Sequence, residues 1–185
     1  MSNSAVAPSP TGVLALRKLY LVRFGFAIIW AALILIGGST LTAFSVTLIV
    51  IYPLFDVAAA IVDARTSRSG AATTGLYVNM VISVLAAIGL AIALSSGTSA
   101  ALLVWGGWAI ASGALQLAVG ISRRRLGGQW AIIFAGALSI FAGGGFAALS
   151  GSSDPKLTAL GGYAILGGIF FLISALRMGR AAKRL

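Results

Sequence analysis

Only three carboxylates occur in the 185 residues, at Asp56, Asp63 and Asp154. Asp56 lies near the middle of an apolar stretch, in the run YPLFDV. A carboxylate at the centre of a membrane costs about 2.5–3.5 kcal/mol on insertion scales, so it faces a protein interior and commonly marks function. Desolvation also favours its neutral form. The chemistry that this position suggests is the binding of a proton or of a polar partner inside an apolar bundle.

Two interpretations of Asp56 remain open from the sequence. It binds or relays a proton, or it serves as a protonated hydrogen-bonding group between helices. Pro53 cannot donate to the carbonyl group one turn earlier, so we expect a helix kink there. The polar groups placed deeply enough to reach Asp56 are Tyr52, Asn79 and Gln116.

Asp63 follows Asp56 by seven residues and shares its helix face, but it lies close to a basic end of the stretch. We interpret it as part of a surface ion pair with Arg23, Arg65 or Arg68.

The residue types that are missing narrow the function further. The sequence has no His, no Cys and no Glu, so it lacks the usual nucleophiles, general bases and transition-metal ligands. We therefore expect no enzymatic activity, no metal and no cofactor.

The elements that must hold these residues are membrane-spanning helices. Hydrophobic residues make up 59% of the chain and charged residues only 9%, with a mean hydropathy of +1.06. A spanning helix needs about 20 mostly apolar residues. Residues 1–18 are expected to be a disordered cytoplasmic tail and residues 178–185 a basic cytoplasmic tail. Six segments between them qualify, at about 19–38, 43–63, 73–95, 100–121, 129–149 and 157–177. The sequence predicts an all-α, polytopic membrane protein of six helices, arranged as three repeated hairpins.

The Lys and Arg residues fix the predicted orientation. Six crossings place twelve of the thirteen on one side, with only Lys156 opposite. Because cytoplasmic loops carry the excess of Lys and Arg, both termini are expected in the cytoplasm. The run Arg123, Arg124 and Arg125 is interpreted as a topology anchor that also meets anionic lipid head groups. The net charge of +10 is accounted for in this way, without nucleic acid.

Small residues recur along the fourth and sixth segments. Gly106, Gly113 and Gly120 are seven residues apart, as are Gly161 and Gly168, at an offset of 55 from the first pair. Such stripes allow the close backbone approach that holds helices together in lipid. We expect them to pack helices within one protomer, with a pore lining or a homo-oligomer interface as alternatives.

Aromatic residues are expected in two places. Trp30 is deep enough to be a packing residue. The others lie mostly near predicted span ends and are interpreted as interfacial belts: Tyr20, Tyr52, Tyr77, Trp105, Trp108, Trp130 and Tyr163.

The repeated patterns GWAIxxG in the fourth segment, WAIIxxG in the fifth and GYAIxxG in the sixth resemble the short repeat of HdeD-like membrane proteins. Tyr52 and Asp56 match the aromatic residue and the Asp of that family's second helix, although Val57 replaces a Gly and Pro53 intrudes. The resemblance implies a bacterial inner-membrane protein related to acid resistance.

The sequence thus supports two functions. The first is a non-enzymatic membrane protein of the HdeD-like type, acting in acid or envelope stress tolerance. The second is a small transporter or channel for protons or a small neutral solute, with Asp56 at its centre. Its path would be lined by Asn79, Gln116, Ser83, Ser112 and Ser139.

Overall fold

The computed structural model describes residues 10–38, 40–66, 71–126 and 128–182. This part of the chain forms six α-helices and two short 3₁₀ turns, and it contains no strand. Each α-helix is long and apolar enough to cross a membrane, which confirms the predicted six-helix, polytopic all-α fold. The helices are α1 (Pro10–Gly37), α2 (Ala43–Thr66), α3 (Ala71–Ala93), α4 (Thr98–Ser122), α5 (Gln129–Ser150) and α6 (Ala159–Ala182). The 3₁₀ turns are η1 (Leu94–Ser96) and η2 (Arg124–Leu126).

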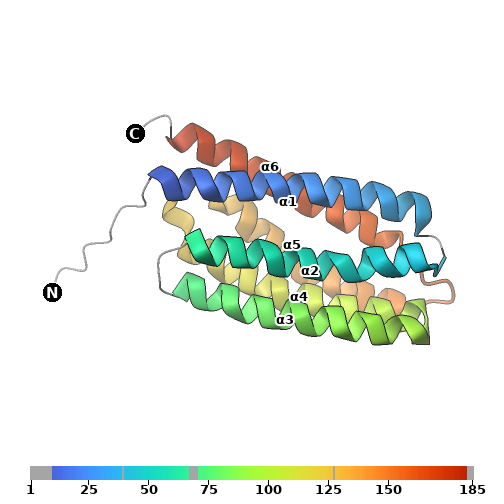
Figure 1. The fold of residues 1–185 in the computed structure, drawn as a ribbon. Coiled ribbons are helices and arrows are strands. Elements are labelled where there is room, and N and C mark those ends of the chain that lie inside the picture. Colours follow the sequence, from blue (N-terminus) through green and yellow to red (C-terminus); the bar gives the residue numbers. More distant parts are fainter. Residues whose placement is uncertain (1–9, 39, 67–70, 127, 183–185) are drawn as a thin grey trace.

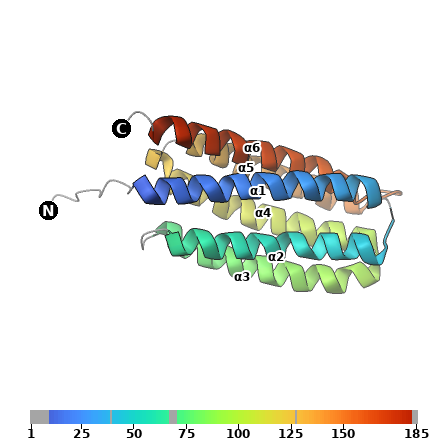
Figure 2. The same ribbon diagram turned by 45° about the horizontal axis from the view of Figure 1, so that its top comes forward.

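The helices run side by side and alternate in direction, so the chain enters and leaves the bundle at the same end (Figures 1 and 2). Each helix packs against the next one along the chain, and α6 returns to pack against α1. This pattern closes the six helices into a ring around a shared interior. Large apolar side chains such as Ile36 and Phe141 point outward, at 83% and 79% exposure, as expected of surfaces that meet lipid.

The first and last helices of the chain, α1 and α6, extend beyond the predicted spans. α1 begins at Pro10, so residues 10–18 are helical rather than disordered, and α6 continues through Ala182 into the expected basic tail. Residues 1–9 and 183–185 of the two expected tails lie outside the described residues. The early start of α1 matters for the site, because it places Arg23 thirteen residues into the helix. At about 1.5 Å per residue, that is about 20 Å from its first turn.

Glycines bring α4 and α5 into direct backbone contact. A Cβ added at Gly106 would lie 2.6 Å from the carbonyl oxygen of Gly143, and one at Gly136 would lie 2.7 Å from that of Gly113. At Gly120 the added atom would meet Ile133 at 3.0 Å. This seam leaves no room for a side chain, so the two helices pack through van der Waals contact of their backbones.

The corresponding stripe on α6 packs against α1. A Cβ at Gly161 would lie 2.8 Å from the side chain of Leu35, and one at Gly168 would lie 3.2 Å from Ala27. Both stripes therefore join neighbouring hairpins within one protomer.

A cluster of aromatic rings fills the half of the bundle nearer the α1–α2 connection. Trp30 and Trp105 stack with ring centroids 5.5 Å apart, and Tyr52 contacts both. Trp108 meets Trp105 edge to face at 5.2 Å. Trp30, as expected, is a packing residue: it is 2% exposed, and its indole N–H donates to the Leu48 carbonyl at 2.6 Å.

The interpretation of the aromatic residues as interfacial belts is therefore wrong for most of them. Only Tyr77 and Trp130, both 59% exposed, face outward. Tyr20, Trp105 and Trp108 are buried, and Tyr52 and Tyr163 are partly buried. Position along a span does not reveal which face of the helix a ring occupies.

The end of the bundle that holds the chain ends has a basic rim. The exposed members of the rim are Lys18, Arg65, Arg124, Arg125, Arg177 and Arg180. Arg68, Lys183 and Arg184 lie outside the described residues. At the opposite end Lys156 pairs with Asp154 at 2.9 Å, and this hydrogen bond, together with the carboxylate charge, raises the pKa of Lys156.

Candidate functional site

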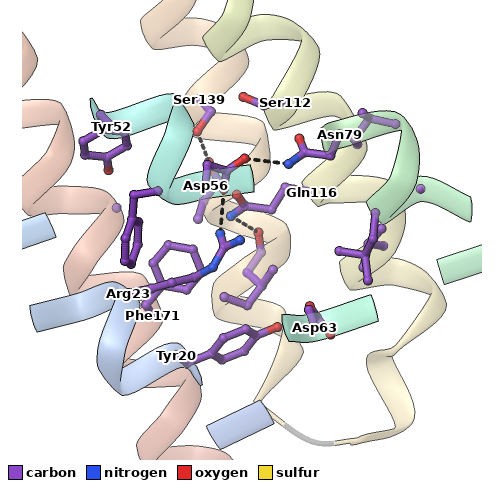
Figure 3. Close-up of a pocket in the computed structure, with 18 of the residues that line it drawn as sticks. Tyr20, Arg23, Tyr52, Asp56, Asp63, Asn79, Ser112, Gln116, Ser139 and Phe171 are labelled. Carbon is purple, nitrogen blue, oxygen red and sulfur yellow. Dashed lines mark hydrogen bonds and ion pairs between the residues drawn. The ribbon is translucent and has the colours of Figure 1, made fainter. Parts of the chain in front are cut away.

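A cavity of about 100 Å³ lies inside the ring, and all six helices contribute to its wall. It lies between the aromatic cluster and the end with the basic rim. Its lining combines charged and amide groups with phenyl rings; the polar members shown in Figure 3 are Arg23, Asp56, Asp63, Asn79, Ser112, Gln116 and Ser139. A polar wall of this kind inside a membrane bundle marks a binding site or a pathway, because polar groups at that depth are costly to place in lipid.

Asp56 is the centre of this wall, held by groups from two other helices (Figure 3). Its Oδ1 forms an ion pair with Arg23 Nη1 of α1, and the two atoms are 3.0 Å apart. Its Oδ2 accepts hydrogen bonds from Asn79 Nδ2 at 2.6 Å and from Ser83 Oγ at 2.9 Å, both on α3. Both members of the ion pair are only 14% exposed. The polar partners expected for Asp56 did not include Arg23, whose guanidinium lies at the same depth.

The network continues from Asp56 into α4. Ser83, which donates to Asp56, accepts a hydrogen bond from the indole N–H of Trp108 at 3.0 Å. Three helices thereby fix one carboxylate oxygen, so Oδ2 is rigidly placed while Oδ1 depends on Arg23 alone for the contacts described here.

Arg23 itself is incompletely satisfied. Its guanidinium lies over the ring of Phe171 on α6, 5.1 Å from the centroid. Its Nε is buried without a hydrogen-bond partner among the described residues. A buried N–H without an acceptor is costly, so this arginine has unused capacity to bind an oxygen atom.

A second buried ion pair closes the cavity toward the basic rim. Asp63 Oδ2 and Arg123 Nη1 are 2.8 Å apart, and their side chains are 7% and 8% exposed. Beside them the hydroxyl of Tyr20 donates to Gln129 Oε1 at 3.4 Å, and Gln129 donates to the sulfur of Met178 at 3.6 Å.

Two interpretations therefore need correction. Asp63 is not a surface group, and Arg123 does not point to the lipid head groups with its neighbours Arg124 and Arg125, which are exposed. Seven residues place Asp63 below Asp56 on the same inward face of α2, where Arg123 reaches it from the end of α4. Arg23, one of the three partners that we expected for Asp63, instead forms an ion pair with Asp56.

The remaining predicted site residues gather around the same cavity with weaker links. Gln116 lines it but donates to the backbone carbonyl of Ile132 at 3.4 Å rather than to Asp56. Tyr52 lines it from the aromatic cluster. α2 continues as a helix through Pro53, which is buried. The helix is therefore not divided at the position where we expect a kink.

Two serines of the predicted path, Ser112 and Ser139, also line the cavity, although their protons are already donated. Ser112 donates to the carbonyl of Trp108 at 2.7 Å, and Ser139 donates to that of Ala135 at 2.9 Å. Ser139 also lies 3.0 Å from the hydroxyl of Tyr163. Among the described residues of the wall, the buried donor that has no acceptor is Arg23 Nε.

Sequence reasoning missed Arg23 and Arg123 as internal partners. A usable signal was present: two carboxylates share one inward face, and each requires a cation from another helix. In the described parts of the chain, no group of three or more His, Cys, Asp or Glu side chains is arranged to hold a metal ion.

The fold and this site together define a multi-pass membrane protein with a polar cavity inside a six-helix ring. No protein-family model, no curated protein and no solved structure matches the sequence. The geometry of the site is therefore the basis for a proposed function.

Proposed function

We propose that this chain is a non-enzymatic protein of the bacterial inner membrane that binds a small, net-neutral polar solute in its central cavity and passes it across the bilayer. The observation that carries this proposal is the cavity itself, a space of about 100 Å³ with a charged and polar lining at the middle of a membrane bundle. A purely structural bundle has no need of such a space, because empty volume and buried polar groups both destabilise it.

The volume limits the size of the solute. An apolar cavity of about 150 Å³ accepts benzene, so a space of about 100 Å³ suits a molecule of roughly four to six non-hydrogen atoms.

The charges limit its net charge. Arg23 balances Asp56, and Arg123 balances Asp63. A solute with a net charge would therefore find no unbalanced opposite charge among these lining residues. A net-neutral solute needs no such charge.

The test is a flux measurement on the full-length chain in liposomes. Stopped-flow light scattering with glycerol, urea and glycine reports solute entry, and an enclosed pH-sensitive dye reports protons. The proposal predicts entry of at least one solute above the rate of protein-free liposomes. Rates equal to those of protein-free liposomes for every solute and for protons would refute it.

A role in acid or envelope stress tolerance is the second candidate, supported by the resemblance to HdeD-like proteins and by the two internal carboxylates. These carboxylates form ion pairs with Arg23 and Arg123 inside the bundle. The test is the survival of a deletion strain after acid challenge, complemented with wild type, with Asp56→Asn, or with the exposed control Asp154→Asn. Failure of wild type to restore survival would exclude this role.

The proposed orientation places both termini and the basic rim in the cytoplasm. The excess of Lys and Arg at one end of the bundle supports it, and so does the affinity of such a rim for anionic lipids.

A further inference from the structure

The ion pair between Arg23 and Asp56 has the features of a ligand site that is filled by its own side chains. It is a single contact, Nη1 to Oδ1 at 3.0 Å, rather than a two-pronged pairing. Both residues line the cavity, and Arg23 Nε has no acceptor. A ligand that supplies an oxygen to the guanidinium would therefore satisfy a donor that the closed pair leaves unsatisfied.

We propose that the solute bound here is a small zwitterion of the α-amino acid type, with its carboxylate on Arg23 and its ammonium group on Asp56. This inference rests on the proposed function and names the substrate class of that same site.

Charge complementarity favours a zwitterion over an ion. The two protein charges are in contact, so an anion bound to Arg23 meets the carboxylate of Asp56, and a cation bound to Asp56 meets the guanidinium. A molecule with both charges a few bonds apart can separate Arg23 from Asp56 and leave every charge paired. Both protein charges then keep a partner in an interior where unpaired charge is strongly unfavourable.

The other polar groups argue against an uncharged solute. The hydroxyl protons of Ser83, Ser112 and Ser139 are already donated to Asp56 or to backbone carbonyls. Asp56 Oδ2 already accepts two hydrogen bonds. An uncharged amide or alcohol that entered between Arg23 and Asp56 would separate the ion pair without replacing its charges.

The walls set the size of the zwitterion. The guanidinium of Arg23 lies over the ring of Phe171. Phe26 and Phe55, whose stacked rings have centroids 3.7 Å apart, also line the cavity. With about 100 Å³ available, these rings leave space for glycine or alanine but not for a large side chain.

The experiment compares solutes of similar size and different charge on the full-length chain in liposomes. The probes are labelled glycine as zwitterion, acetate as anion, ethylamine as cation and acetamide as uncharged solute. The expected result is saturable glycine uptake that unlabelled alanine inhibits, with no saturable uptake of the other three.

Two variants sharpen the test. Arg23→Gln combined with Asp56→Asn removes both charges while the side chains keep hydrogen-bonding capacity. It is expected to weaken glycine binding by about 30-fold or more, as loss of a buried charge partner does. The control Asp154→Asn, an exposed carboxylate outside the spans, should transport glycine like wild type. If the double variant does not assemble, the wild-type comparison of the four probes decides alone.

The outcomes separate the two proposals. Saturable entry of acetamide without glycine would overturn the zwitterion assignment and leave a site for a net-neutral solute in place. Saturable entry of acetate or ethylamine without glycine would overturn the net-neutral solute as well. Undiminished glycine uptake by the double variant would overturn the assignment of Arg23 and Asp56. If no probe entered, and glycerol, urea and protons also failed to enter, the proposed function itself would fall.

Discussion

Removing both members of the central ion pair should destabilise the fold much less than the sum of the two single changes. In Asp56→Asn, Arg23 loses its only carboxylate partner in the site. Breaking a buried ion pair costs about 3–5 kcal/mol, and the 14% exposure of both side chains places the expected loss near the lower value, about 3 kcal/mol. Arg23→Gln should cost less, about 2 kcal/mol, because Asn79 and Ser83 still donate to the carboxylate.

The double variant Arg23→Gln with Asp56→Asn has no unpaired charge, so it should lose only about 2 kcal/mol, mainly from weaker hydrogen bonds to the new amide. The single losses together amount to about 5 kcal/mol, which gives a coupling of about 3 kcal/mol between the two positions.

The assay is unfolding of the purified chain in mixed micelles with increasing sodium dodecyl sulfate, followed by the fluorescence of its four tryptophans. Asp154→Asn is the matched control, because its carboxylate is 74% exposed. The reasoning is refuted if Asp56→Asn unfolds within about 0.5 kcal/mol of wild type, or if the two single losses simply add in the double variant.

Three further predictions use the same logic at other positions. Gly113→Ala should cost about 1–3 kcal/mol, because its Cβ would lie 2.7 Å from Ser139 Cβ. The control Gly107→Ala, whose added Cβ has nothing within 4 Å, should unfold at the same detergent concentration as wild type or at a slightly higher one. Equal stabilities of the two variants would refute the tight packing of α4 against α5. Arg123→Gln should destabilise by about 3 kcal/mol because it removes the guanidinium of a buried ion pair with Asp63. The exposed neighbour change Arg124→Gln should cost less than about 0.5 kcal/mol in the same titration. The chain has no Cys, so a single cysteine introduced at Thr66 or at Ser153 is the only site for a membrane-impermeant maleimide. The cysteine at position 153 should react from outside intact spheroplasts, and the cysteine at position 66 should react only from the opposite side. Labelling of both positions from one side would contradict the six-span topology.

The choice of partner for each carboxylate shows where sequence reasoning stopped. Asp56 and Asn79 were expected to be near each other, and they are hydrogen bonded at 2.6 Å. Arg23 was assigned to the membrane surface because the first helix was expected to begin at residue 19. Since α1 begins at Pro10, the same arginine lies at the depth of Asp56. An error in a helix boundary thus became an error in the electrostatics of the site.

What the sequence determined by itself is the number of crossings, the all-α fold and the seams of small residues, because these depend on the length, hydropathy and spacing of local segments. It also identified Asp56 as the polar centre, since a carboxylate in an apolar stretch is conspicuous without any neighbours. Only the tertiary structure decided which arginine meets which carboxylate, which aromatic rings face inward and how large the enclosed space is. These depend on how six helices are rotated about their axes and shifted along them, and packing between segments far apart in the chain fixes that arrangement.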